Sequence, residues 1–563
     1  MQELYRQARE WMAQDPDPRT RAELEQLLAT APSDSAAEDE LADRFRQRLQ
    51  FGTAGLRGAL GAGPNRMNRV TVLRAAAGLA AWLHHNHDRE RAPLVVVGYD
   101  ARHNSARFAV DTASVLSAAG IIVRCLPEPL PTPVLAHTVA DLGAAAGVMV
   151  TASHNPPQDN GYKVYVGGAG PAAGSQILPP IDTEISAAID AVGPVDQLPL
   201  DEEGWRTFGT EPVHRYLDSL SQLPLGPDRD LSVTYTPLHG VGAETLQAAF
   251  ARHGFPAPHL VPQQARPDPD FPTVAFPNPE EPGALDLALA EADRVGSDLV
   301  LANDPDADRL AAAVPGHGML TGDEVGALLA EHVLAHTSGP DRIVATTVVS
   351  ASLLSTLASA YGVRYEETLT GFKWLARVGG DGSDPARCVC AYEEALGYCL
   401  AGDTCRPVAD KDGIGAALVL AAVAATAKRS GRTLVDLRDE QARRYGLHLT
   451  RQLTRRFANP AERTAVMARL RQHPPTQLAQ LRVSQVVDLA TGEAGLPPTD
   501  AIRYQLTGPV TARLVVRPSG TEPKLKCYLE VVCAPQDDVS AARAEASRQM
   551  DELAEAVHGL VLG

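Results

Sequence analysis

The chain has 563 residues, which at roughly 100–200 residues per domain predicts about three to five domains. Apolar residues make up 44% of the sequence and charged residues 21%, as in ordinary globular proteins. The net charge of −18 argues against a nucleic-acid-binding protein, which needs a basic face, so any anion-binding site must be locally basic.

The sequence contains no run of about 18 apolar residues, so we expect no membrane partner. Its start, MQELYRQAREWMAQDPDP, is charged and amphipathic and differs from a secretory signal. Seven cysteines are a sparse and odd number, from which we expect no disulfide framework and a cytoplasmic location. Cys388, Cys390, Cys399 and Cys405 lie close together, but without a C-x2-C pair they indicate packed core more than a zinc site.

Residues 1–50 are predicted to be helical, and from about residue 70 helix and strand patterns alternate. The helices are predicted at Val70–His84, Ser105–Ala119, Glu324–Leu334 and Ile414–Ala427. The apolar strands between them are predicted at Leu94–Val97, Ile121–Val123, Leu231–Tyr235, Leu299–Ala302, Ile343–Val348 and Val389–Ala391. This alternation indicates α/β layers.

The last segment differs, because strands at Ala512–Val516 and Leu525–Val532 precede a helix at Asp538–Leu560, which predicts a smaller α+β domain. Loop-like breaks occur near 193–212, 316–323 and 450–460, and the basic stretch RQLTRRF (451–457) is interpreted as a solvated linker. We therefore predict four domains, with the bounds 1–207, 208–320, 321–452 and 453–563.

Four polar loops follow predicted strands, and because ligands gather at strand ends in α/β sheets, we expect them to share one cleft. The first is GVMVTASHNPPQDNGYK, in which Ser153 follows the strand Gly147–Val150. A serine hydroxyl is a weak nucleophile that needs a base, and His154 and Lys163 are the nearby candidates. From this loop alone, a capping serine in an ordinary turn is the simpler interpretation.

The second loop, VLANDPDADRL, carries three carboxylates at alternate positions, Asp304, Asp306 and Asp308. At 4 Å and an effective dielectric constant of about 20, each pair repels by about 4 kcal/mol, which a divalent cation removes. A calcium EF-hand would need Gly and Glu where the chain has Arg309 and Pro315, so the pattern favours Mg²⁺ over Ca²⁺. A solvated acidic turn is the alternative.

The third loop, CAYEEALGY, places Glu393 and Glu394 after a strand. Paired carboxylates can accept hydrogen bonds from sugar hydroxyls or take part in acid–base chemistry. Two surface glutamates at the start of a helix would explain this pattern equally well.

The fourth loop, LVVRPSGTEPKLK, has the composition of a phosphate site in an acidic protein. Arg517 can donate two hydrogen bonds to a phosphate, and Ser519 and Thr521 supply hydroxyls. Gly520 allows backbone N–H groups to approach an anion. An ordinary hairpin loop is the alternative.

Together, T-A-S-H-N-P, D-P-D-A-D-R, E-E-x-x-G and R-P-S-G-T-E-P resemble, in content and order, the α-D-phosphohexomutase superfamily. The resemblance is to the phosphoglucomutase/phosphomannomutase branch and covers residues 50–535. Supporting segments are FGTAGLRG (51–58), GYDARHNS (98–105), YTPLHGVG (235–242) and TGFKW (370–374). The form E-E-A-L-G-Y is similar to that of phosphoglucomutase-2-like and phosphopentomutase proteins.

The resemblance implies three consecutive α/β domains with mixed sheets and a smaller C-terminal α+β lid domain around one central cleft. It implies that Ser153 carries the phosphoryl group and that Mg²⁺ is held by Ser153, Asp304, Asp306 and Asp308. Arg57, His154 and Lys163 match the catalytic residues. The residues that match substrate-binding positions are Arg309, Thr370, Gly371, Glu393, Arg517, Ser519, Gly520 and Thr521.

We therefore expect a phosphoglucomutase acting on small sugar phosphates, primed by glucose 1,6-bisphosphate, as a monomer or homodimer. Many relatives have Ser where this chain has Ala395, so phosphomannomutase, phosphopentomutase and hexose-bisphosphate synthase activities remain alternatives. A phosphatase using Asp304 as an aspartyl-phosphate nucleophile is an alternative of another class. A hydrolase needs no second phosphate loop, so R-P-S-G-T-E-P argues against it.

Overall fold

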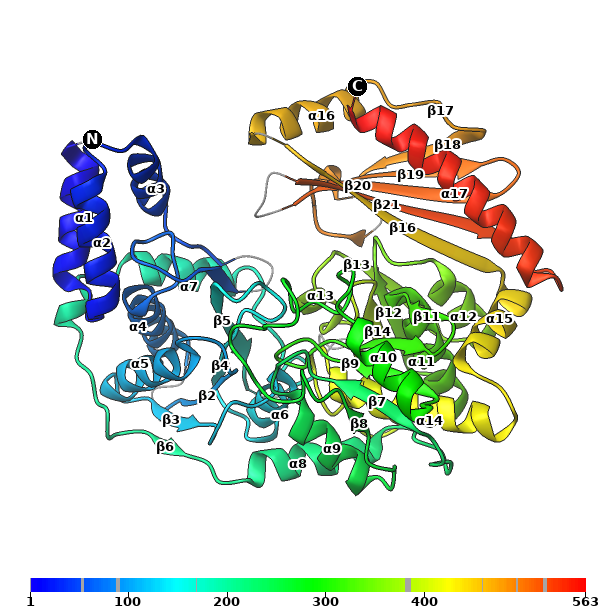
Figure 1. Ribbon diagram of the computed structural model, residues 1–563, viewed down its shortest axis with the longest axis horizontal. Coiled ribbons are helices and arrows are strands. Elements are labelled where there is room, and N and C mark those ends of the chain that lie inside the picture. The colour runs from blue at the N-terminus through cyan, green and yellow to red at the C-terminus, as the bar shows by residue number, and fades with distance from the viewer. Residues whose placement is uncertain are drawn as a thin grey trace.

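The computed structural model describes residues 2–51, 55–87, 92–168, 170–379, 386–457, 459–492, 495–519 and 524–562. It contains four sheets in chain order, three of them mixed and the last antiparallel (Figure 1). The predicted architecture of three α/β domains followed by an α+β domain is confirmed.

Three helices precede the first sheet, as predicted for residues 1–50: α1 Gln2–Gln14, α2 Pro18–Thr30 and α3 Ser35–Phe45. Asp17 and Asp34 begin α2 and α3 as N-caps, each accepting a hydrogen bond from a backbone N–H of the first turn. Apolar residues of these helices, including Leu24 and Leu41, pack against α4. The three-helix layer therefore belongs to the first domain.

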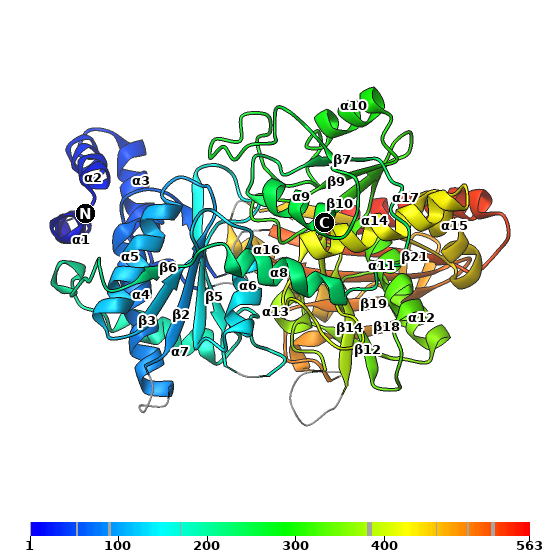
Figure 2. The same ribbon diagram turned by 90° about the horizontal axis from the view of Figure 1, so that it is seen from below.

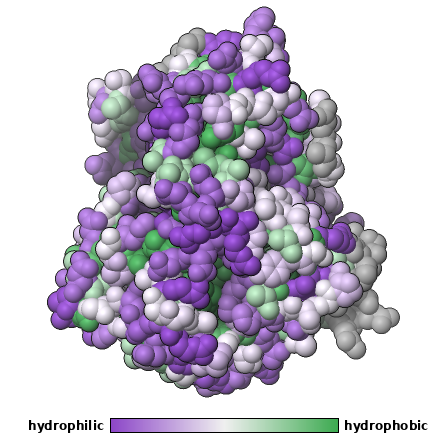
Figure 3. All heavy atoms as spheres, turned by 90° about the vertical axis from the view of Figure 1, so that its right-hand side faces the viewer, coloured by the Kyte–Doolittle hydropathy of each residue, from purple (hydrophilic) through white to green (hydrophobic). Residues whose placement is uncertain are grey.

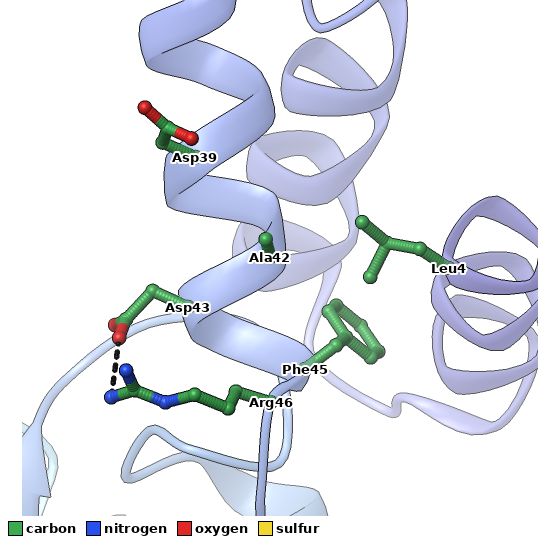
Figure 4. Close-up of a pocket in the computed structure, with 6 residues that line it drawn as sticks. All are labelled: Leu4, Asp39, Ala42, Asp43, Phe45 and Arg46. Carbon is green, nitrogen blue, oxygen red and sulfur yellow. Dashed lines mark hydrogen bonds and ion pairs between the residues drawn. The ribbon is translucent and has the colours of Figure 1, made fainter. Parts of the chain in front are cut away.

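A shallow surface pocket of about 380 Å³ lies on this layer, away from the loops singled out in the sequence. Leu4 of α1 points towards Phe45 of α3, while Asp43 and Arg46 form an ion pair of 3.0 Å on the outer side (Figure 4). The layer also contacts the connection after β1, where the carboxylate of Glu23 accepts a hydrogen bond from the backbone N–H of Ala62 at 3.0 Å.

The first sheet has the order β1-β5-β4-β2-β3-β6. Its strands are β1 Leu56–Ala59, β2 Leu94–Tyr99, β3 Ile122–Cys125, β4 Ala146–Val150, β5 Asp159–Val166 and β6 Arg206–Thr207. Its helices are α4 Arg69–Asn86, α5 Ser105–Ala118, α6 Thr132–Asp141 and α7 Ile181–Asp190, with a 3-10 turn at Val195–Gln197. Helices lie on both sides of the sheet (Figure 2), which is why β2 and β4 read as continuous apolar runs.

The second and third sheets have the orders β11-β10-β9-β7-β8 and β13-β12-β14-β15. The second domain contains α8 Glu211–Ser219, a 3-10 turn at Leu220–Gln222, β7 Val233–Thr236, α9 Gly242–Arg252, β8 His259–Leu260, α10 Asp286–Val295, β9 Leu299–Ala302, β10 Ala311–Val314 and β11 Gly318–Leu320. The third contains α11 Gly322–His336, β12 Arg342–Thr347, α12 Leu353–Tyr361, β13 Arg364–Thr368, α13 Phe372–Leu375, β14 Arg387–Glu393, β15 Gly397–Leu400, α14 Gly413–Arg429 and α15 Leu434–Tyr445.

The fourth sheet is antiparallel, with the order β16-β21-β20-β19-β18-β17, and α17 lies along it (Figure 1). Its elements are β16 Leu447–Arg456, α16 Pro460–Gln472, β17 Gln477–Leu478, β18 Leu481–Asp488, a 3-10 turn at Leu489–Thr491, β19 Ile502–Thr507, β20 Thr511–Pro518, β21 Lys524–Cys533 and α17 Val539–Leu562. The boundary expected at 452/453 falls inside β16. The stretch interpreted as a linker is thus an edge strand of the fourth sheet.

One apolar core runs through the second and third domains and extends to first-domain residues such as Val96 and Tyr165, and α14 is almost entirely buried in it. Cys388, Cys390 and Cys399 lie buried on β14 and β15, in agreement with a packing role, whereas Cys405 is exposed, so the core interpretation is wrong for that residue. Among the described residues no single helix has the length and apolar content to cross a bilayer. Only α14 and α15 taken together have that length and composition, and the chain bends by 88° between them. The face in Figure 3 is mostly hydrophilic, with small separate apolar areas.

The four loops singled out in the sequence occupy equivalent places, because each connects two adjacent antiparallel strands. They join β4 to β5, β9 to β10, β14 to β15 and β20 to β21. In the first three domains the first strand of each pair is also parallel to a neighbour inside its sheet. The fold therefore presents one hairpin connection from each domain.

Candidate active site

The loop between β4 and β5 holds Ser153 in a left-handed backbone conformation, with φ of 52°. Thr151 stabilises this turn, because its Oγ1 accepts a hydrogen bond of 2.9 Å from the Ser153 N–H. The N–H of Asn155 donates to the carbonyl of Ala152 at 3.1 Å and closes the turn. A non-glycine residue in this conformation is uncommon and marks a position that the surroundings enforce.

The serine meets the aspartate loop of the second domain. Ser153 Oγ donates a hydrogen bond of 2.6 Å to Asp304 Oδ2, and both side chains are buried. The aspartate loop turns through Ala307, at φ of 54°, and the Arg309 N–H donates to Asp304 Oδ1 at 3.0 Å. Residues 151 positions apart are therefore in direct contact, as the predicted shared site requires.

Lys163 neutralises the other two aspartates of the loop. Its Nζ lies 2.7 Å from Asp306 Oδ2 and 2.9 Å from Asp308 Oδ2, and its side chain is 2% exposed. Burial alone would lower the pKa of Lys163, but the two carboxylates raise it above its ordinary value. Burial and the neighbouring carboxylates raise the pKa of Asp304 well above its usual range.

The aspartate cluster fits a hard divalent cation. The three side chains offer carboxylate oxygens that all lie within 4.8 Å of one another. Within the part of the chain that the structure describes, the buried Oδ1 atoms of Asp306 and Asp308 have no hydrogen-bond partner. Buried carboxylate oxygens without a partner are costly, and oxygen-only coordination is what Mg²⁺ prefers.

His154 and Arg57 complete the first domain's contribution. His154 Nδ1 lies 3.1 Å from Ser153 Oγ, and burial together with Arg309 and Arg57 lowers the pKa of His154 well below its ordinary value. The imidazole is therefore neutral. Arg57 Nη1 donates to Asn155 Oδ1 at 2.8 Å, and β1 pairs with β5, which carries Lys163.

Arg309 joins the second domain to the third. Its Nη1 donates to the carbonyl of Ala395 at 2.8 Å, and the Leu310 N–H donates to the carbonyl of Leu396 at 3.0 Å. Glu393, at the end of β14, is buried, and burial raises its pKa to about 7 despite nearby cations. The loops of the second and third domains are thus tied together through backbone contacts.

A cleft of about 690 Å³ lies beside these loops and takes lining residues from all four domains. His154 lines it from the first domain, Arg309 from the second, Glu394 and Ala395 from the third, and Lys526 from the fourth. Glu394 faces this cleft, whereas Glu393 is absent from its described lining. The acidic pair thus divides, with one glutamate towards the cleft and one towards the aspartate loop.

The remaining predicted substrate-binding residues lie on the third and fourth domains. Thr370 and Gly371 are half-buried at the start of α13. Arg517 lies near the end of β20 and Ser519 directly follows the strand, where the Ser519 N–H donates to the carbonyl of Lys524 at 2.8 Å. The other two predicted residues of this loop, Gly520 and Thr521, lie outside the described residues.

Sequence reasoning missed two residues at the centre of the site. Lys411 is buried with its Nζ 3.4 Å from Asp308 Oδ2, and Thr132 Oγ1 donates to Asp306 Oδ2 at 2.7 Å. The sequence A-D-K-D-G before the apolar stretch of α14 was a detectable signal for Lys411. Thr132 sits in an ordinary T-P helix start, and nothing in its neighbourhood of the sequence distinguishes it.

Family models for phosphoglucomutase/phosphomannomutase match the chain in order. The α/β/α domains I, II and III match residues 48–193, 214–318 and 321–445, and the C-terminal domain matches residues 505–549. Each of the four matches contains one of the hairpin loops described above.

Relatives with similar sequences extend over nearly the whole chain. A "Probable phosphomannomutase" of Haemophilus influenzae is 41% identical over 485 residues, which cover 85% of this chain and 96% of that protein. A phosphopentomutase of Mus musculus is 33% identical over 605 aligned positions, which cover 98% of this chain and 94% of that protein. A crystal structure from Thermus thermophilus, assigned as a phosphomannomutase, is 25% identical and superposes with a TM-score of 0.66. The superposition covers 90% of this chain and 99% of that chain.

Proposed function

Because the chain belongs to the phosphoglucomutase/phosphomannomutase family of α-D-phosphohexomutases, we propose that it is a phosphoglucomutase that works through phosphoserine 153. It would interconvert α-D-glucose 1-phosphate and glucose 6-phosphate, with glucose 1,6-bisphosphate as primer and intermediate. The observation that carries this proposal is the 2.6 Å hydrogen bond between Ser153 and Asp304, which brings a nucleophile against a cation-binding cluster.

Mg²⁺ is the proposed cation, held by Asp304, Asp306, Asp308 and an oxygen of phosphorylated Ser153. When bound, it would neutralise charge on the phosphoryl group during transfer. Lys163 adds a fixed positive charge beside Asp306 and Asp308. Arg309, which packs against Asp308 at 3.9 Å, is proposed to face the same phosphoryl group.

Proton transfer is assigned to the groups around the serine. When a sugar hydroxyl attacks phosphoserine, a sugar O–P bond forms and the serine O–P bond breaks, so the hydroxyl must lose its proton and the serine oxygen must gain one. His154 is neutral and its Nδ1 lies 3.1 Å from Ser153 Oγ, so it suits the role of taking the proton of the sugar hydroxyl and passing a proton to the serine oxygen. Lys163 stays protonated between two carboxylates and suits charge neutralisation. Arg57 would orient the transferring group through its contact with Asn155.

The two-step reaction needs a second phosphate site, because the bisphosphate must turn round between the steps. Arg517, Ser519, Gly520 and Thr521 are proposed for that site, on a lid domain whose closure would exclude water. The sugar between the two phosphates would contact the third domain. The residues proposed for that contact are Thr370, Gly371 and Glu393.

A second candidate is phosphopentomutase activity. It is favoured by the similarity to a mammalian phosphopentomutase over 98% of this chain and by Ala395, which removes a hydroxyl from the cleft wall. The sugar is therefore the part of the proposal that experiment must decide. Specific activities on glucose, mannose, glucosamine and ribose 1-phosphates, each with its bisphosphate primer, would rank the substrates. A higher rate on ribose phosphate would overturn the proposal that glucose phosphate is the substrate.

The covalent step has its own test. Protein incubated with glucose 1,6-bisphosphate should gain one phosphoryl group, which peptide mass spectrometry should locate at Ser153. Ser153→Ala should abolish both incorporation and turnover. Phosphate located at Asp304 would instead support the aspartyl-phosphate alternative.

A further inference from the structure

Behind the serine loop lies a buried arginine, Arg102, that holds the loop by its carbonyl groups. Its Nη2 donates to the carbonyl of Ser153 at 2.7 Å and also to that of Asn155. Its Nη1 donates to the carbonyls of Pro156 at 2.8 Å and Asp159 at 3.1 Å. One planar cation thus binds four carbonyls of a single turn, a geometry that the compact ammonium of lysine cannot reproduce.

One flat face of this guanidinium is covered by the second domain. The ring of Phe271 lies 4.9 Å from the carbon of the Arg102 guanidinium, and Phe271 is only 2% exposed. Phe271 itself has φ of 44°, so its own turn is specialised. Beside it, His103 and Asp270 join the same two domains at 2.7 Å.

The clamp therefore reaches the serine through its backbone, whereas the aspartate loop reaches its side chain. Ser153 Oγ is engaged by Asp304, while its carbonyl is engaged by Arg102. Both Phe271 and Asp304 belong to the second domain, so the second domain fixes the serine from two directions. The left-handed conformation of Ser153 is what these contacts enforce.

We propose that Arg102, seated on Phe271, is a positioning residue that fixes Ser153 in the conformation required for phosphoryl transfer. It touches no reacting atom and acts through the loop backbone. This inference rests on the proposed role of Ser153 as the phosphoryl carrier. Since small misplacements of a reacting group can reduce a rate by about 100-fold, loss of the clamp should act mainly on kcat.

The chain offers a matched control in the same domain as Phe271. Arg229 donates to the carbonyls of Leu225, Gly226, Asp228 and His253 and lies 4.6 Å from the ring of Phe255. This pair has the same chemistry as Arg102 and Phe271 but holds a turn that carries none of the site residues. Substitutions there measure the structural cost of losing such a clamp.

The experiment compares Arg102→Lys and Phe271→Leu with Arg229→Lys and Phe255→Leu. We expect Arg102→Lys to lower kcat by about 100-fold with KM changed less than threefold, and Phe271→Leu to lower kcat by about tenfold. The controls should stay within threefold of wild type. Equal losses in both pairs, or a loss in KM alone, would overturn the proposal; if Arg102→Lys does not fold, Phe271→Leu decides it.

A second readout separates this inference from the proposed function. Hydrogen exchange should be faster in residues 151–160 of the Arg102 variant, where the N–H groups of Ser153 and Asn155 are bonded within the turn. Unchanged exchange there would overturn the clamp. If wild-type protein incorporates no phosphate at Ser153, the phosphoserine proposal fails, and this exchange measurement still decides whether Arg102 orders the loop.

Discussion

Lys163 Nζ, on a strand of the first domain, lies 2.7 Å from Asp306 Oδ2 in a loop of the second domain. Both side chains are buried, so this contact fixes the serine half of the site against the aspartate half. Thr132 contributes to the same alignment, because its backbone N–H donates to the carbonyl of Asp306 at 2.9 Å. The same residues therefore form the interface between the first two domains and the candidate active site.

Replacing Lys163 by Met should reduce kcat by at least about 100-fold, because the transferring phosphate loses a fixed positive charge. It should also destabilise the fold by about 3 kcal/mol, since buried carboxylates lose their partner. Steady-state kinetics and urea unfolding measure the two effects. Lys428→Met is a control, because Lys428 pairs with Asp298 near the surface. A kcat within fivefold of wild type in Lys163→Met would contradict the assigned role.

Mg²⁺ should raise the unfolding temperature of the protein through the aspartate cluster. At a hundred times the dissociation constant, binding to the folded state adds about 2.7 kcal/mol of stability. Asp308→Asn should abolish this gain, whereas Asp403→Asn, at an exposed ion pair with Arg387, should keep it. Turnover should vanish on chelation and return with Mg²⁺. An equal thermal shift in both variants would place the cation elsewhere.

The contact between the fourth domain and the third domain should weaken in acid. Glu530 of β21 is buried, pairs with Arg513 at 2.9 Å and accepts a hydrogen bond from the Ser352 N–H of the third domain at 2.7 Å. Burial alone would raise the pKa of Glu530, but Arg513 and His448 lower this pKa to about 2 from an ordinary value of 4.5. A carboxyl group whose pKa is lowered by folding stabilises the folded state at pH values above its pKa in the unfolded chain. That stabilisation is lost as the pH falls towards 2.

This difference between the two pKa values of Glu530 corresponds to about 3 kcal/mol. The free energy of unfolding of wild type should therefore exceed that of Glu530→Gln by roughly this amount near pH 6. The gap should close between pH 5 and pH 2, which chemical unfolding at several pH values would measure. Glu545→Gln, on the exposed face of α17, should show no such convergence. A gap that is independent of pH would mean that the carboxylate charge does not matter there.

Much of the fold could be predicted because buried strands and helices produce different apolar patterns. Leu299–Ala302 has the same bounds in the structure as in the prediction, and Val70–His84 lies within α4. β5 escaped prediction, because its polar residues include Lys163, which is buried only by pairing with aspartates from another domain. β16 was taken for a linker because it is basic and polar, with Arg451, Arg455 and Arg456 along an edge strand, where charge discourages unwanted pairing.

The site was predictable as a set of loops but not as a set of contacts. Asp304, Asp306 and Asp308 are recognisable because three neighbouring carboxylates require a counter-charge. Their protein partners are not, since Lys411 and Thr132 reach them only through the packing of other domains. The division of Glu393 and Glu394 between two environments likewise follows from the β14–β15 hairpin and not from residue type.

The cleft wall at Ala395 should control the choice of sugar. Ala395 lines the cleft next to Glu394, and its carbonyl is fixed by Arg309, so a hydroxyl introduced there would be held in place. Ala395→Ser should raise kcat/KM for glucose 1-phosphate relative to ribose 1-phosphate by about tenfold, the effect of one hydrogen bond of roughly 1.4 kcal/mol. The exposed Ala251 gives the control Ala251→Ser, which should leave the ratio unchanged. If Ala395→Ser changes kcat/KM for both substrates equally, position 395 does not select the sugar, and the sugar preference must be set by the glutamates or by the fourth domain.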